Sequence, residues 1–132
     1  TTPYSAGAGA AYIFLQAPNN PDQLNVNKGF KAQGDITATG NVTAYSDKRL
    51  KDNIKKIENA LDKIEQMNGY TYTMENTRCT GLIAQEVLPV LPEAVSGSEE
   101  THYALAYGNM MGLIVEALKE MREKMRNIEA RL

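Results

Sequence analysis

Apolar residues recur every six positions between Leu24 and Ala44, and this spacing predicts a repeat of short β-strands. Two units that begin at Gly34 and Gly40, Gly-Asp-Ile-Thr-Ala-Thr and Gly-Asn-Val-Thr-Ala-Tyr, show the pattern most plainly. Alternation within each unit puts a β-branched residue and an alanine on one face of a strand. Short repeated strands of this kind hide their apolar face by stacking on further copies. Residues 1–45 therefore favour the end of a fibrous stem, a triple-stranded β-helix in which three chains wind together. The alternative is a pair of β-hairpins in a small sandwich.

A different spacing, with alternating steps of four and three, runs through the end of the chain. The apolar positions in this series are Tyr107, Met111, Ile114, Leu118, Met121, Met125, Ile128 and Leu132. This heptad pattern predicts a helix over residues 107–132, about 39 Å long at roughly 1.5 Å per residue. Leucine at a and isoleucine at d favour three or four strands over two, so we expect a parallel coiled coil in a homotrimer. The alternative is one amphipathic helix packed on its own domain.

The residues between these two patterns, 46–106, predict a compact α+β region. Apolar positions at helical spacing from Leu50 to Met67 predict an amphipathic helix that ends at Asn68-Gly69, with Asp47 or Asp52 as its cap. Residues 70–73 alternate and are β-prone, 75–77 form a turn, and 96–100 form a loop. Residues 81–84 are either a buried strand or the lead into a short helix. The expected fold class is α+β, with a β-helix stem end, this middle region and a coiled coil.

Composition narrows the classes of function. Fourteen Lys and Arg residues stand against sixteen Asp and Glu, a net charge of -2, which argues against a nucleic-acid or anionic-membrane binder. No apolar run approaches the roughly 20 residues of a membrane span, and no leader peptide is evident. The first residue is not Met, so we expect the sequence to be a piece of a longer protein. One cysteine, Cys79, and one histidine, His102, give no basis for a metal or cofactor site.

The remaining candidate chemistry lies where the repeat gives way to the predicted helix, at Ser46 and Lys51. A serine hydroxyl can attack a carbonyl when a neutral lysine amine takes its proton. Desolvation, or cations such as Lys48 and Arg49, would favour the neutral amine. Five residues on a helix turn through about 500°, so the two side chains meet only across a strand-to-helix break or between chains. The structural alternative is a solvated, basic helix start.

Residues 46–54 carry a resemblance to a known family. They read Ser46-Asp47-Lys48-Arg49-Leu50-Lys51-Asp52-Asn53-Ile54 and are similar to the signature S-D-x-R-L-K-x-N-I. That signature opens the intramolecular chaperone domain, also called the S74 peptidase domain, of bacteriophage tailspikes, endosialidases, tail fibres and neck appendage proteins. The similarity continues through residues 81–87 and 92–95 to the heptad helix. It thus covers residues 46–132, preceded by the stem end at 1–45.

This resemblance implies a mechanism and a site. Three copies trimerise through residues 46–132, hold the strands of the parent fibre stem in register while they fold, and then cut themselves. The implied scissile bond is Tyr45–Ser46, with Ser46 as nucleophile and Lys51 as general base. The implied supporting residues are Asp47, Arg49 and Asn53. The implied setting is a phage virion precursor that folds in the bacterial host cytoplasm, from which the chaperone part is released. The alternative is a non-cleaving trimeric or receptor-binding fibre tip.

Overall fold

The computed structural model describes residue 26 and residues 28–132 of a chain that divides into two compact units, Thr1–Tyr45 and Ser46–Leu132. Residues 1–25 of the predicted stem end lie outside the described residues. In the described part of the first unit the backbone forms neither helix nor strand. Apolar side chains of the six-residue repeat are exposed there, from 47% for Val26 to 89% for Val42. Over this described part, the repeat therefore forms no hairpin within one chain.

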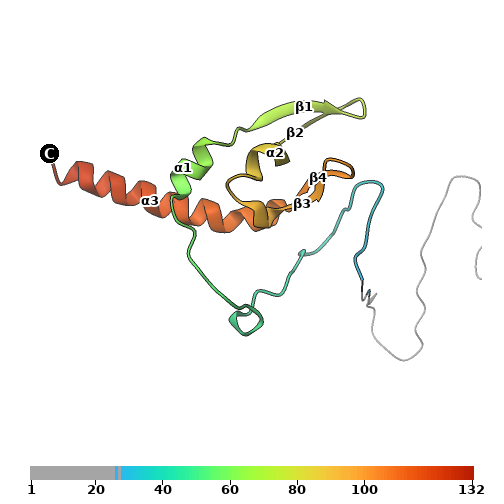
Figure 1. The fold of residues 1–132 in the computed structure, drawn as a ribbon, viewed down its shortest axis with the longest axis horizontal. Helices are drawn as coiled ribbons and strands as arrows, with labels where there is room; N and C mark the ends of the chain where they lie inside the picture. Colours follow the sequence, from blue (N-terminus) through green and yellow to red (C-terminus); the bar gives the residue numbers. More distant parts are fainter. Residues whose placement is uncertain (1–25, 27) are drawn as a thin grey trace, which may run out of the picture. The chain divides into compact units, whose positions relative to one another are not determined.

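The second unit begins with an extended segment in place of the first part of the helix predicted over residues 50–67, whereas the later part of that prediction is confirmed by a helix over Ala60–Glu65 (Figure 1). The segment contains a 3-10 turn, η1 (Lys48–Leu50), and the first α-helix, α1 (Ala60–Glu65), starts only after it. The first part of the expected helix is wrong because Asn53 and Asn59 adopt left-handed φ angles of 53° and 54°, which no α-helix contains. We call residues 46–59 the arm.

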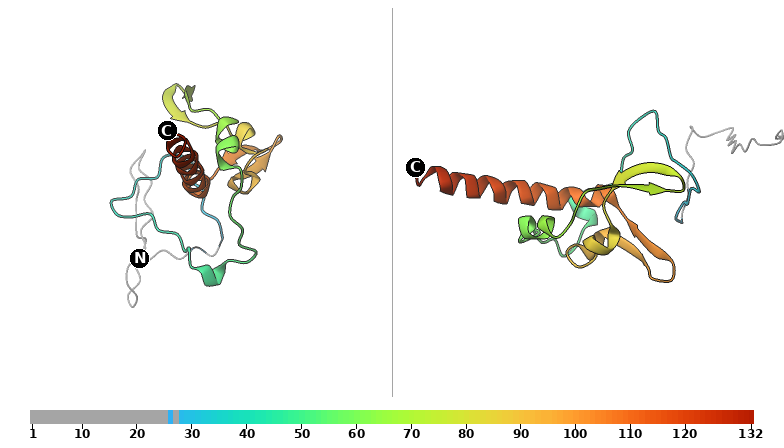
Figure 2. Two further views of the ribbon diagram at one scale, coloured as in Figure 1. Left: turned by 90° about the vertical axis from the view of Figure 1, so that its left-hand side faces the viewer. Right: turned by 90° about the horizontal axis from the view of Figure 1, so that it is seen from above.

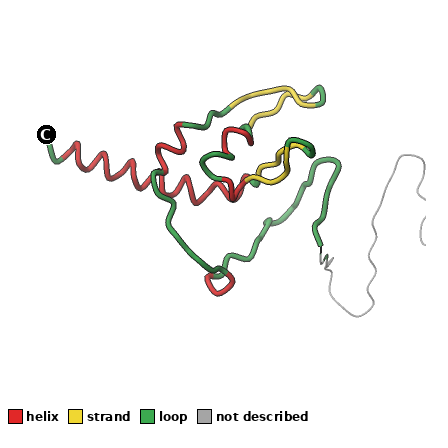
Figure 3. The backbone as a smooth tube through the Cα atoms, in the orientation of Figure 1, coloured by secondary structure: helices red, strands yellow, loops and turns green. Residues whose placement is uncertain are grey.

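Two antiparallel hairpins follow α1 (Figure 3). The first pairs β1 (Tyr70–Met74) with β2 (Thr77–Gly81) around a turn with positive φ at both central residues, which suits a two-residue hairpin. The predicted strand and turn are confirmed here. A short helix, α2 (Ala84–Val87), and a 3-10 turn, η2 (Pro92–Ala94), lead to the second hairpin, β3 (Val95–Ser98) with β4 (His102–Leu105). The predicted loop over 96–100 is therefore wrong in its first half.

The long C-terminal helix, α3 (Met111–Glu129), follows a 3-10 turn, η3 (Tyr107–Met110). The predicted helix is thus confirmed from Met111 to Glu129, while its first four positions form the tighter turn and its last three lie beyond the helix. Helix α3 lies beside α1 and extends well past it (Figure 2). The core of the unit is formed by Ala60, Val87, Leu91, Ala94, Met110, Leu113 and Ala117.

Only the first half of α3 contributes to this core, since every residue from 121 to 132 is exposed. No helix in the described part of the chain is long and apolar enough to cross a membrane. The α+β class is confirmed for the second unit. Because α3 has an uncovered second half, this unit leaves a long helical surface available to further copies.

Candidate active site

The arm brings the two predicted catalytic side chains together within one chain. Lys51 Nζ donates a hydrogen bond to Ser46 Oγ over 2.6 Å. The turn η1 makes this possible, because Lys51 N donates back to the carbonyl of Lys48 at 3.1 Å and the chain reverses between the two residues. The pair was expected to meet across a strand-to-helix break or between chains; it meets instead within one chain, across a 3-10 turn in an extended segment.

Two of the predicted supporting residues build this turn. Asp47 caps η1 by accepting a hydrogen bond from Arg49 N at 2.8 Å. The guanidinium of Arg49 also donates to both carboxylate oxygens, with Nη2 at 2.7 Å from Oδ2. These bonds lower the pKa of Asp47 and raise the pKa of Arg49. Since Arg49 is held by Asp47, Lys51 is the cation that faces the serine.

The other two predicted residues contribute in different ways. Asn53 has its left-handed φ angle two residues after Lys51, and it bends the arm through its backbone. Tyr45, on the amino side of the predicted scissile bond, has 94% of its surface exposed. Cys79 and His102 lie on β2 and β4 rather than on the arm. Among the described residues, no group of three His, Cys, Asp or Glu side chains could hold a metal ion.

The Ser46–Lys51 pair has the geometry of a nucleophile and its base but not their usual enclosure. A distance of 2.6 Å is within hydrogen-bond reach for proton transfer between a hydroxyl and an amine. Both residues are exposed to solvent. The apolar residues that flank Lys51 are exposed as well, Leu50 by 69% and Ile54 by 61%. The arm of a single copy therefore holds the reacting groups together without desolvating them.

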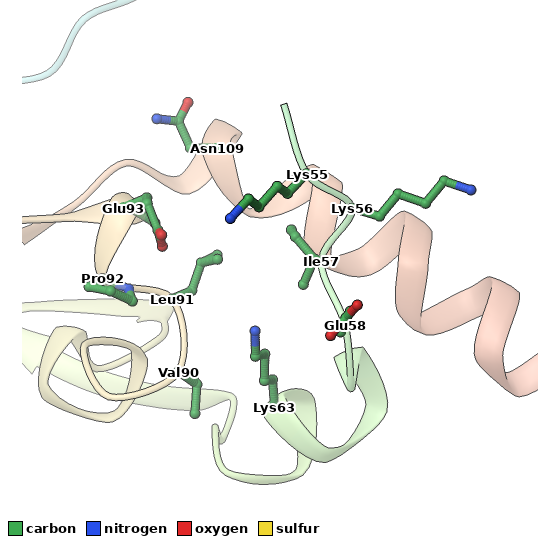
Figure 4. Close-up of a pocket in the computed structure, with 11 residues that line it drawn as sticks. Lys55, Lys56, Ile57, Glu58, Lys63, Val90, Leu91, Pro92, Glu93 and Asn109 are labelled. Carbon is green, nitrogen blue, oxygen red and sulfur yellow. The ribbon is translucent and has the colours of Figure 1, made fainter. Parts of the chain in front are cut away.

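A groove at the root of the arm is a separate feature (Figure 4). The ammonium groups of Lys55 and Lys63 point into it, whereas Lys56 points away. Neither residue of the Ser–Lys pair lines the groove. Its lining contains no serine, cysteine or histidine.

Sequence reasoning gave no role to the contacts that hold the rest of the unit together. Glu86 accepts hydrogen bonds from the Tyr70 hydroxyl at 2.7 Å and from Asn68 N at 3.0 Å, which ties β1 to α2. The bond from Tyr70 lowers the pKa of Glu86 and raises that of the phenol. The Tyr107 hydroxyl similarly accepts from Leu82 N at 3.0 Å. Glu86 and Leu82 both lie in the motif at residues 81–87, and this motif was the one sequence feature that pointed to these contacts.

Comparison with known proteins identifies the class of this domain. Residues 46–96, which begin at the candidate nucleophile, match the S74 peptidase family, described as the chaperone of endosialidase. The resemblance drawn from the sequence is therefore confirmed over these residues.

The relatives of the chain are phage fibre proteins. It is 36% identical over 103 residues to the long tail fiber protein Gp37 of Enterobacteria phage K3, covering 70% of this chain and 8% of that protein. For Gp37 of Escherichia phage AR1 the identity is 38% over 96 residues, covering 64% and 9%. For Gp37 of Enterobacteria phage M1 it is 33% over 120 residues, covering 78% and 48%. The chain thus spans less than half of each of these relatives.

Proposed function

We propose that the chain is an intramolecular chaperone that assembles as a homotrimer, guides the folding of a phage fibre stem, and then cuts itself at Tyr45–Ser46. The observation that carries this proposal is the 2.6 Å contact between Lys51 Nζ and Ser46 Oγ, in a segment that matches the S74 peptidase family. The tail-fibre relatives support a virion component as the setting, and we propose a precursor that folds in the bacterial host cytoplasm. No cofactor is required.

The reaction needs only the two side chains and water. Ser46 Oγ adds to the carbonyl carbon of Tyr45 while the neutral Lys51 amine accepts the hydroxyl proton. Lys51 then gives that proton to the amide nitrogen of Ser46 as the C–N bond breaks, which leaves an ester. Water hydrolyses the ester, so Tyr45 ends as a carboxylate and the serine regains its hydroxyl. The enzyme therefore acts once, as a self-cleaving serine peptidase.

Assembly supplies what a single arm lacks. A lysine amine in water carries its proton at neutral pH, whereas burial favours the neutral form that a general base requires. The exposed Leu50 and Ile54 on either side of Lys51 would bring the arm against another apolar surface. Cleavage would then follow assembly, and an unassembled copy would stay intact.

The surface that we propose for that assembly consists of the eight apolar heptad positions from Tyr107 to Leu132, and we call it the seam. All eight of its positions are exposed, from 40% at Ile114 to 99% at Leu132. Leu113 and Ala117, on a neighbouring face of the same helix, are buried against the core. A continuous apolar face that remains exposed beside a buried one is typical of an interaction surface. The residues at its a and d positions favour three copies.

The trimer gives the chaperone its physical means of action. Pairing of strands from different chains is slow, because such non-local contacts repay the entropy of ordering only late. A coiled coil forms locally and brings the three stem segments together, which raises their effective concentration. It also fixes their register, which matters because a slip of one residue turns every side chain to the wrong face.

Self-cleavage is tested by electrophoresis and mass spectrometry of the purified wild-type chain with Ser46→Ala, Lys51→Ala and the neighbouring control Lys48→Ala. We expect a fragment that begins at Ser46 from the wild type and from Lys48→Ala, and none from the other two. An intact wild-type chain under conditions where it trimerises would contradict the peptidase and favour the alternative, a permanent trimeric or receptor-binding fibre tip.

A further inference from the structure

Helix α1 begins without a cap from its own N-terminal residue. Asn59, which ends the arm, is left-handed and its side chain makes no capping hydrogen bond. The first two amides of the helix donate instead to Glu120 on α3: Ala60 N lies 3.0 Å from Oε1, and Leu61 N lies 2.8 Å from Oε2. A carboxylate is well suited to this place, because it satisfies free N–H groups and opposes the positive end of the helix.

The position of Glu120 gives this cap a second consequence. Glu120 is half-buried, and every residue of α3 after it is exposed. It lies on the same side of the helix as Leu113 and Ala117, about a third of a turn from the seam at roughly 100° per residue. One rigid helix therefore presents the seam to other copies and holds the root of the arm.

Besides this cap, the root of the arm is held by Ile57, whose side chain packs on the core, and hydrogen bonds add little to that constraint. Apart from the turn η1, the backbone hydrogen bonds between described residues include none that is donated by an amide of residues 52–59. The Ser46–Lys51 contact is local and does not depend on where the arm points. What Glu120 fixes is the point at which the arm leaves the body of the unit, next to residues 60 and 61.

We propose that Glu120 is a positioning residue for self-cleavage, which couples the trimer helix to the arm that carries the Ser–Lys pair. The proposal rests on the self-cleavage proposed above. Without the carboxylate the two amides lose their acceptor, and the arm is held at its root only by the packing of Ile57, so its direction is less well defined. The reacting groups would stay together but would seldom reach the enclosed position that assembly creates.

The test compares cleavage rate, trimer mass and thermal midpoint in Glu120→Ala, Glu120→Gln and the control Glu116→Gln. Glu116 lies one turn earlier, where its carboxylate pairs with Lys119 at 3.2 Å, and the hydrogen bonds between described residues include none from it to an amide of the arm or of α1. We expect all three variants to remain trimeric, with cleavage slowed about a hundredfold in Glu120→Ala, the size of effect that a misplaced reacting group produces. Glutamine keeps one carbonyl oxygen as an acceptor, so Glu120→Gln should be intermediate, and Glu116→Gln should cleave as the wild type does.

A structural role alone is separated from positioning by a variant matched in stability. Ala117→Gly weakens the packing of α3 against α1 while it leaves the cap intact. At equal loss of thermal midpoint, positioning predicts much slower cleavage in Glu120→Ala than in Ala117→Gly, and equal rates would overturn it. If the wild type cleaves and Glu120→Ala cleaves at the same rate, the role of Glu120 is refuted while the peptidase proposal stands. An uncut wild type would reject both proposals.

Discussion

Replacing one seam residue, Leu118→Ala, should weaken the trimer and leave the fold of each copy almost unchanged. Leu118 is 60% exposed in the single chain. Full burial of a leucine is worth about 1.5–3 kcal/mol, so covering this fraction contributes about 1–2 kcal/mol per copy. Three copies meet in each layer of a trimeric seam, which gives about 3–5 kcal/mol per trimer. That loss would lower the association constant by roughly a hundredfold to several thousandfold.

Leu113→Ala is the matched control, because it removes the same atoms from the buried face of the same helix. Leu113 is fully buried, and its truncation should cost about 2–5 kcal/mol in the folding of each copy. Sedimentation or light scattering over a concentration series measures association, and thermal unfolding in dilute solution measures the fold. The seam would be refuted if Leu118→Ala assembled as the wild type does, or if it destabilised dilute monomers as much as Leu113→Ala.

Three further predictions concern the turn and the two contacts around the first hairpin. Asp47→Ala removes the cap of η1, so cleavage, followed by mass spectrometry, should slow at least about tenfold while the trimer persists; an unchanged rate would remove the turn from the mechanism. Gly81→Ala places a Cβ against the hydroxyls of Tyr72 and Tyr107 and should lower the free energy of unfolding by about 1–3 kcal/mol in a denaturation experiment. Its control is Gly69→Ala, which should be neutral because nothing lies within 4 Å of the added Cβ. The hydrogen bond from Tyr70 lowers the pKa of Glu86 below its ordinary 4.5, so the unfolded chain takes up this proton first. The contribution of this bond is therefore full above pH 4.5 and falls as the pH drops through the lower folded pKa; Tyr70→Phe should flatten this part of a stability-versus-pH curve, and an identical curve would contradict the assignment.

Periodic patterns in the sequence predicted those helices and strands that are formed by the same residues that carry the pattern. The heptad spacing predicts α3, and the helix indeed runs through the seam positions from Met111 to Ile128. Alternation at 70–73 predicts β1, and the turn after it is also predicted, whereas its partner strand β2 was not. In each case the residues that form the element also carry its signal.

The first part of the helix predicted over 50–67 fails for a reason that periodicity cannot show. Its apolar spacing is correct, and the later positions from Ile57 onward pack on the core. Asparagine is tolerated in helices and also favours the left-handed conformation, so Asn53 and Asn59 break the pattern without a sequence signal. The strand over 95–98 was missed because Ser-Gly-Ser has little β propensity of its own. Gly97 adopts a φ of 90° there, where a side chain would collide with the backbone of the paired strand.

The candidate site was likewise predicted only in part. The Ser46–Lys51 pair was found from a contiguous motif, together with the condition that the two side chains cannot meet on a continuous helix. The distance of 2.6 Å that meets this condition depends on η1, a turn that the sequence analysis placed inside a helix. Glu120 was out of reach of such reasoning, because its partners lie about 60 residues earlier in the chain. A single surface glutamate on a long helix carries no signal of that contact.

The central claim is that assembly switches on cleavage at Tyr45–Ser46. Intact-mass measurement of the wild-type chain over a dilution series, with the trimer fraction determined in the same samples, tests it most directly. The account predicts that the fragment beginning at Ser46 accumulates in proportion to the trimer and is missing at dilutions where the chain is monomeric. An unbroken chain in fully trimeric samples, or equal cleavage of monomer and trimer, would contradict it.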